Sequence, residues 1–125
     1  MFIILTSMFF TTMTKTSVDC SSGSDIVFAL DTSGSIGRKY VQEIVGFLEQ
    51  LINSFNVNAN DTDLTVSRIG MLTYADTATI QFQLNTYSKR TEILQAINVR
   101  YSGGTTNAAD AIRYTRLLDY FNTDN

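Results

Sequence analysis

Histidine is absent from this chain of 125 residues, and cysteine occurs once, as Cys20. Without histidine the chain cannot form a Ser-His-Asp triad, a histidine-paired thiolate or a zinc site with an imidazole ligand. With one cysteine it can form neither an internal disulfide nor a thiolate metal cluster. These absences remove much of the side-chain chemistry that enzymes use, so we do not expect catalysis.

Charge is also scarce. Charged residues make up 17% of the chain, and nine Lys and Arg against twelve Asp and Glu give a formal net charge of −3. The basic residues are spread thinly and form no basic patch, which argues against a nucleic acid partner. The 44% of hydrophobic residues is typical of a globular chain, and the length fits one domain.

The first 22 residues differ from the rest. Residues 1–10 (MFIILTSMFF) are mostly apolar, and residues 11–22 are small and polar with a single lysine. This is the outline of a secretory signal peptide, with an apolar stretch too short to span a bilayer. No basic residue precedes the run and no clean A-x-A site follows it, so a disordered leader or a wrongly chosen start codon stays open. We divide the chain into a leader, residues 1–22, and one domain, residues 23–125.

After the leader, the patterning becomes regular. Residues 26–30 are consecutively apolar, as expected of a strand covered on both faces in a parallel sheet. Residues 38–55 repeat apolar side chains with a helical period and predict an amphipathic helix, where Gly46 would mark close packing on the sheet. Residues 66–74 and 78–84 predict two strands joined by a turn short enough for an antiparallel hairpin.

Two further helices complete the predicted fold. One is expected to begin at a Ser88 cap, and the other to cover about residues 108–121. The inner side of the last helix is predicted to carry Ala108, Ala111, Ile112, Thr115 and Leu118. This order predicts an α/β fold, a Rossmann-like doubly wound sheet that is mostly parallel with one antiparallel edge strand. The first, most apolar strand should lie centrally, and we expect Phe28, Phe47 and Tyr74 in the core.

Polar side chains gather directly after the first apolar strand. Asp31, Ser33 and Ser35 alternate on a loop rich in glycine and hydroxyl groups. Open α/β sheets bind ligands at this carboxyl edge, where the strand order reverses. A carboxylate and two hydroxyls are hard oxygen ligands, suited to Mg²⁺, Mn²⁺ or Ca²⁺ rather than to zinc or copper. A helix N-cap and turn is the alternative interpretation, because Asp and Ser favour both.

An aspartate at the end of a buried strand also occurs in aspartate-nucleophile phosphatases. Those enzymes need D-x-D, so that a second carboxylate acts as general acid, and Ser33 stands at that second position here. The chain contains neither a G-x-x-x-x-G-K-[ST] phosphate loop nor a G-x-S-x-G elbow. Phosphatase, phosphate-loop and hydrolase chemistry are therefore not expected.

The segment at residues 31–35 (DTSGS) matches the D-x-S-x-S signature of the metal-ion-dependent adhesion site in von Willebrand factor A and integrin inserted domains. The segments DIVFALDTSGSIG, RIGMLTYAD and YSGGTTNAADAI follow the family order over about residues 23–121. The chain most resembles the A domains of matrilins and microfibrillar collagens. Thr106, in the last of these segments, stands where the family places a threonine of the site.

The resemblance implies a working site. Ser33 and Ser35 would coordinate the metal directly, Asp31 would act mostly through water, and Thr106 would join from its later loop. Mg²⁺ is the expected ion, with Mn²⁺ or Ca²⁺ as substitutes, and a Glu or Asp of a protein ligand would complete the shell. The implied protein is a secreted adhesion module of the extracellular matrix that binds a matrix protein such as collagen. A structural or non-functional A domain without metal is the alternative, and an intracellular assembly platform is a weaker one.

The resemblance also implies that the domain is incomplete, covering about its first half to two-thirds. The family continues with further strands and a T-D-G-type loop whose aspartate completes the site. We therefore expect the first strand to pair on one side only, and the chain by itself to be unstable and to bind metal weakly. Secreted A domains often pair a cysteine such as Cys20 with one beyond the final helix. Asn60, in Asn60-Asp61-Thr62, is an N-glycosylation acceptor if the chain is secreted.

Overall fold

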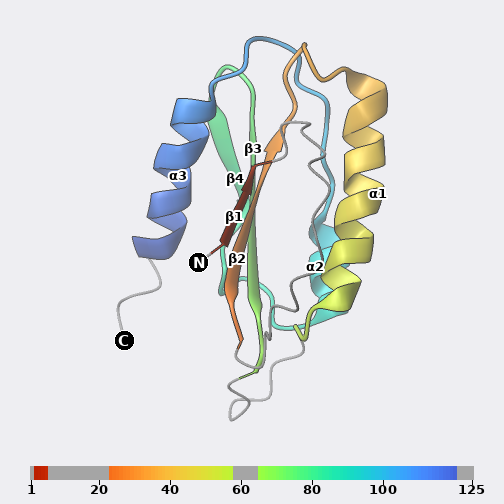
Figure 1. The fold of residues 1–125 in the computed structure, drawn as a ribbon, viewed down its shortest axis with the longest axis vertical. Helices are drawn as coiled ribbons and strands as arrows, with labels where there is room; N and C mark the ends of the chain where they lie inside the picture. Colours follow the sequence, from red (N-terminus) through yellow and green to blue (C-terminus); the bar gives the residue numbers. More distant parts are fainter. Residues whose placement is uncertain (1, 6–22, 58–64, 121–125) are drawn as a thin grey trace, which may run out of the picture.

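The computed structural model describes residues 2–5, 23–57 and 65–120 as one sheet with helices on both faces. Cys20 and Asn60, predicted as a disulfide cysteine and a glycosylation site, lie outside the described residues. In Figure 1, α1 and α2 cover one face and α3 covers the other, which confirms the doubly wound α/β prediction. The elements in chain order are β1 (Phe2–Leu5), β2 (Asp25–Asp31), α1 (Arg38–Ser54), β3 (Arg68–Tyr74), β4 (Ala78–Phe82), α2 (Arg90–Ala96) and α3 (Ala108–Tyr120).

The strands lie in the order β1-β2-β3-β4, so β2 is central as predicted. It pairs in parallel with β3, which places Asp31 opposite Tyr74 at the carboxyl ends of both strands. β3 pairs antiparallel with β4 at the sheet edge. Six of the seven β2 residues are buried, because a central strand with a helix layer on each face has no wet side.

The expectation that this first apolar strand pairs on one side only is wrong. Phe2–Leu5, within the expected leader, form β1, which pairs in parallel with β2 from Phe2 opposite Ile26 to Leu5 opposite Ala29. Aromatic and β-branched residues favour strands, and the pairing satisfies backbone groups that a bare β2 edge would leave open. Whether this segment is removed as a signal peptide remains a prediction.

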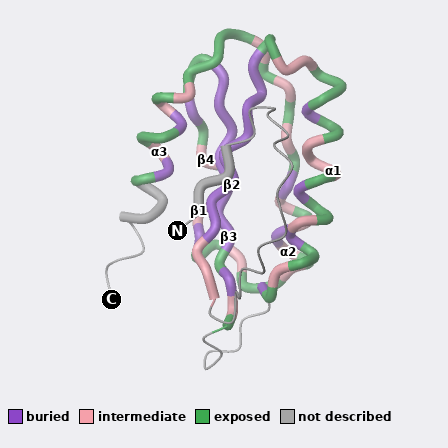
Figure 2. The backbone as a smooth tube through the Cα atoms, viewed as in Figure 1, coloured by how far each residue is buried: buried purple, intermediate pink, exposed green. Residues whose placement is uncertain are grey.

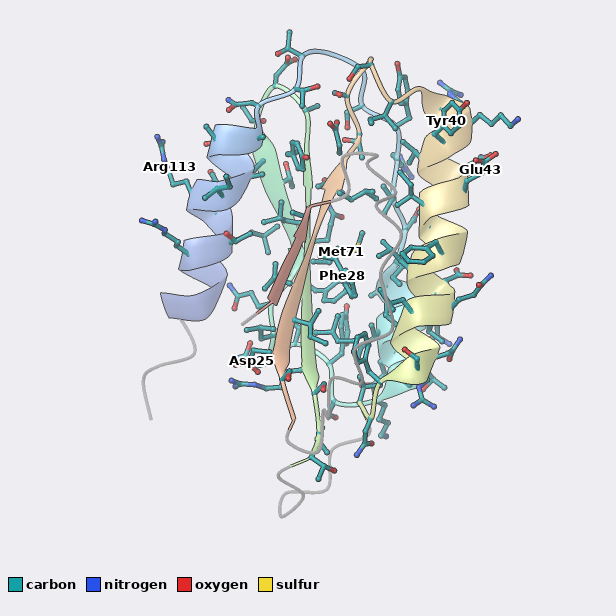
Figure 3. All side chains as sticks on the ribbon, viewed as in Figure 1. Asp25, Phe28, Tyr40, Glu43, Met71 and Arg113 are labelled. Atoms are coloured by element: carbon teal, nitrogen blue, oxygen red, sulfur yellow. The ribbon has the colours of Figure 1, made fainter. Side chains whose placement is uncertain are left out.

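Two apolar clusters lie on the two faces of the sheet. Alternate β2 residues point to opposite sides, so Phe28 packs with Met71 and Ile52 on the α1 side, while Val27 packs with Ala111 on the α3 side. Phe28 and Met71 lie between the sheet and α1 in Figure 3. β2 and β3 are largely buried between the helix layers, and the outer surfaces of α1 and of the described part of α3 are exposed (Figure 2). The prediction that Phe28 and Tyr74 belong to the core is confirmed.

Four finer predictions are wrong. Phe47 is 50% exposed, because it lies about 100° around the helix from buried Leu48. Ile112 is 42% exposed beside buried Ala111 for the same reason. A Cβ at Gly46 would meet no atom within 4 Å, so this glycine makes no close contact with the sheet.

The fourth concerns the start of α2. This helix begins at Arg90 after an N-cap at Lys89 that makes no side-chain cap bond, so Ser88 is not the cap. Leu118 is the last residue of the predicted inner side of α3. The structure does not describe its side chain, so its inner position stays a prediction.

Candidate metal centre

Three connections meet at the carboxyl edge of β2 and β3, at the top of Figure 1. The metal-motif loop, residues 32–37, joins β2 to α1. The β3–β4 turn, residues 75–77, follows β3, and the glycine loop, residues 101–107, leads into α3. The predicted site residues therefore come from two segments that are about 70 positions apart in sequence.

Three hydroxyl groups converge between these two loops. The Ser33 Oγ lies 2.7 Å from the Thr106 Oγ1 and 3.0 Å from the Ser35 Oγ. The Ser35 Oγ and the Thr106 Oγ1 are 3.2 Å apart, which closes a triangle of oxygens. The structure thus brings together the three hydroxyl residues that the sequence singled out.

Asp31 lies at the end of β2, two residues before Ser33. Its side chain is buried, and its Oδ1 accepts a hydrogen bond from the Ser33 amide at 2.8 Å. Burial raises the pKa of the neighbouring Tyr74 phenol, and the negative charge of Asp31 raises it further. A buried carboxylate is costly without compensating hydrogen bonds or a cation, so the electrostatics of this position favour a bound positive charge.

The glycine loop is attached to the metal-motif loop through the backbone. The Ser102 and Gly103 amides both donate to the Thr32 carbonyl at 3.1 Å. The Gly34 amide donates to the Gly104 carbonyl at 3.0 Å. Gly103 and Gly104 have φ angles of 72° and 77°, a left-handed conformation that glycine adopts without steric cost. These contacts bring the end of the glycine loop over the metal-motif loop.

Asp76, in the β3–β4 turn, is a residue to which the sequence prediction gave no role. Its Oδ1 accepts hydrogen bonds from the Thr105 amide at 2.7 Å and the Thr105 hydroxyl at 2.6 Å. The hydroxyl bond is the larger cause, and the amide bond the second, of a lowered pKa of Asp76. Its position offered a signal, because Asp76 follows a parallel strand at the same edge where ligands bind.

Asn107 fixes the other end of the glycine loop. Its side-chain oxygen accepts from the Asp110 amide at 3.1 Å, its own amide donates to the Ala75 carbonyl at 2.8 Å, and its Nδ2 donates to the Asp76 carbonyl at 3.1 Å. The Asp110 carboxylate in turn accepts from the Ala78 amide at 2.8 Å. These hydrogen bonds hold the start of α3 against the β3–β4 turn and the first residue of β4.

The hydroxyl triangle has the dimensions of a cation site. Octahedral Mg²⁺ binds oxygen at 2.0–2.1 Å, so adjacent ligand oxygens lie about 2.8 to 3.0 Å apart. The three spacings in the structure, 2.7, 3.0 and 3.2 Å, lie around this value, and they are also those of hydroxyls hydrogen-bonded to one another. Among the described residues no group of three or more His, Cys, Asp or Glu side chains gathers, so the donors here are hydroxyls beside a single carboxylate. This donor set fits a hard divalent cation.

Comparison with known proteins identifies the fold and its relatives. The profile of the von Willebrand factor type A domain matches residues 25–121. Human collagen alpha-6(VI) chain is 32% identical over 96 residues, 76% of this chain and 4% of that protein. Mouse matrilin-3 is 34% identical over 73 residues, 58% of this chain and 14% of that protein. Bovine vitrin is 31% identical over 96 residues, 76% of this chain and 14% of that protein.

A solved structure agrees with these relatives. Proximal thread matrix protein 1 from the mussel byssus, solved with a zinc-occupied MIDAS motif, superposes with a TM-score of 0.70 at 33% identity. The match covers 80% of this chain and 26% of that protein. The chain thus spans about a quarter of the mussel protein and a smaller share of the collagen, matrilin and vitrin relatives.

The collagens, matrilin-3 and vitrin are proteins of the extracellular matrix rather than enzymes, in agreement with the predicted localisation. In the parts of the chain that the structure describes, no helix is long and apolar enough to cross a membrane. The profile match covers most of the chain. The chain belongs to the von Willebrand factor type A domain family.

Proposed function

We propose that this chain is an extracellular adhesion module that binds a protein ligand through a divalent cation. Ser33, Ser35 and Thr106 would hold the ion by their hydroxyls, and Asp31 would act through water. The observation that carries the proposal is the triangle of three hydroxyl oxygens, one of which belongs to a residue whose amide donates to the buried Asp31 carboxylate. A bound cation would supply a positive charge, and a carboxylate oxygen of the protein ligand would complete its coordination shell.

The spacing of the triangle is compatible with Mg²⁺, the ion that we propose. The zinc ion in the motif of the mussel protein also supports a divalent ion in a site of this family. Because three of the four residues are neutral, we expect weak affinity for the metal alone and a strong preference for an anionic ligand.

The relatives, which are matrix proteins, support another protein of the extracellular matrix as the class of ligand, and we propose a collagen as one such ligand. We propose no nucleic acid partner and no catalytic role for the site. The chain has no histidine for proton transfer.

The test is a calorimetric titration of the full chain with Mg²⁺. Thr106→Val keeps the shape of the side chain but removes one oxygen of the triangle, so we expect the Mg²⁺ affinity to fall at least about tenfold. Thr91→Val is the matched control, because Thr91 is exposed on α2, away from the two loops. Equal Mg²⁺ affinity of the wild type and Thr106→Val would contradict the assignment.

A structural A domain without metal is the second candidate. It is favoured by the fact that the three hydroxyls already hydrogen-bond one another, which satisfies them without an ion. In that case Mg²⁺ at millimolar concentration would give no heat of binding and no rise in the melting temperature. The same titration therefore distinguishes the two candidates.

A further inference from the structure

A groove lies beside the proposed metal site, between α1 and the segment that leads from α2 to the glycine loop. Figure 1 shows this segment running alongside α1 to the edge where the loops meet. The groove has a volume of about 300 Å³ and is lined by Arg38, Val41, Gln42, Val99, Arg100 and Tyr101. Its wall is thus part apolar and part basic, whereas the whole chain has a formal net charge of −3.

The two arginines supply the charge of the groove, and both are exposed. The ion pairs found among the described residues are Lys39–Glu43 and Arg68–Asp25, so neither groove arginine has an acidic partner there. The Arg38 guanidinium lies 5.8 Å from the centroid of the Tyr101 ring, a cation–π contact that keeps it over the groove. Guanidinium groups bind carboxylates in a bidentate manner, so an acidic side chain is the natural occupant.

The groove adjoins the hydroxyl triangle through Tyr101. This residue begins the glycine loop, and its phenol oxygen would lie 3.8 Å from a Cβ at Gly34, inside the metal-motif loop. Arg38 stands three positions after Ser35, at the first residue of α1. One extended peptide is therefore able to reach both places, because each residue spans about 3.3 to 3.6 Å.

We infer that the groove is a second subsite for the same protein ligand, which takes an acidic side chain a few residues from the one that completes the metal shell. The inference rests on the proposed function and adds the kind of partner: a segment with two nearby acidic residues. Arg38 and Arg100 both line the groove, so their positive charge guides the acidic segment to this position. Val99 provides apolar contact for the stem of the acidic side chain.

The test uses capped synthetic peptides of eight residues in Mg²⁺ with the full chain. One carries a single Glu in a Gly-Ser background, and the others add an Asp at each neighbouring position in turn. We expect the best diacidic peptide to bind about three- to tenfold more tightly than the monoacidic one. The double variant Arg38→Gln/Arg100→Gln should lose that preference while its circular dichroism spectrum stays unchanged.

The matched control is Arg113→Gln/Arg116→Gln, which removes two exposed arginines from α3 on the opposite face of the sheet. Figure 3 shows Arg113 pointing away from the sheet and from α1. The control should keep the preference for the diacidic peptide. If both double variants lose it equally, overall charge is the cause and the subsite is wrong.

Failure of the subsite and failure of the metal site give different results. Equal wild-type affinity for both kinds of peptide, with Mg²⁺ required for both, would overturn the subsite and leave the metal site. Absence of peptide binding while Mg²⁺ binds would also overturn it. Binding of the diacidic peptide in EDTA, lost in Arg38→Gln/Arg100→Gln, would keep the groove as an acidic-peptide site and overturn the metal-dependent function.

Discussion

The two loops that form the proposed site are held in place in different ways. The metal-motif loop continues directly from the central strand β2, and Ser33 and Ser35 on this loop lie within four positions of Asp31 at the end of the strand. The glycine loop contributes only Thr106, and it is held by Thr32 and Asp76, which are distant in sequence. One half of the site thus depends on local sequence and the other on long-range hydrogen bonds. Mutations outside the triangle should therefore act mainly through the glycine loop.

Gly104→Ala should have the largest effect, because it combines backbone strain with a collision. An alanine at φ 77° costs about 1 to 2 kcal/mol, and its Cβ would lie 2.5 Å from the Asp76 Oδ2. We expect the free energy of unfolding in urea to fall by more than that strain alone. The Mg²⁺ affinity should fall too, because Asp76 must move away from Thr105.

Gly103→Ala separates the two causes. Its φ is 72°, but the nearest atoms to an added Cβ belong to the Tyr101 ring at 3.9 Å, so strain acts without a collision. Its loss of stability should be the smaller of the two. If the two alanine variants are equally stable, the contact between Asp76 and the glycine loop does not form in solution.

Asp76→Asn should have an intermediate effect, confined to the glycine loop. The amide keeps the shape of the side chain but removes the charge that strengthens both hydrogen bonds from Thr105. We expect weaker Mg²⁺ binding than in the wild type, with less loss than for Thr106→Val, which removes an oxygen of the triangle itself. Calorimetry with Mg²⁺ measures both.

The control for Asp76→Asn is Glu43→Gln, which removes a negative charge from the outer side of α1 (Figure 3). Within the described part of the chain, Glu43 forms an ion pair with Lys39 of its own helix, and it lies outside the loops of the site. Its Mg²⁺ affinity should equal that of the wild type. A similar loss in both variants would mean that net charge, rather than the loop contact, sets the affinity.

The same difference between the loops explains what the sequence could predict. Five consecutive apolar residues before Asp31 indicated a central strand, so the edge of the sheet and the position of Ser33 followed from general rules. Thr106 was placed by resemblance to the family, and the structure puts its hydroxyl beside Ser33. The partnership of Asp76 with Thr105 was not predicted, because it depends on how a hairpin and a later loop meet in space.

The errors in the fold have equally physical causes. Phe47 was expected in the core from its size, but the angular position of a residue on a helix decides its burial, and Leu48 occupies the inward position. β1 was missed because an apolar run at the start of a chain fits both a signal peptide and a strand. Periodicity alone does not distinguish these two, and the pairing with β2 depends on contacts between distant segments.

Thr105→Val should have the smallest effect and is best measured through the pKa of Asp76. The Thr105 hydroxyl bond is the largest cause that lowers this pKa, so its removal should raise the pKa toward the ordinary value of an aspartate. Because the folded pKa is lowered, the contact stabilises the loop above the unfolded pKa and is lost as the pH falls through the folded one. Loosening of the glycine loop on acidification should therefore begin at a higher pH in Thr105→Val than in the wild type. Carbon NMR of the Asp76 carboxyl measures the midpoint, and Thr77→Val, beside Asp76, is the control. An unshifted midpoint in Thr105→Val would show that Asp76 does not anchor the glycine loop through this hydroxyl.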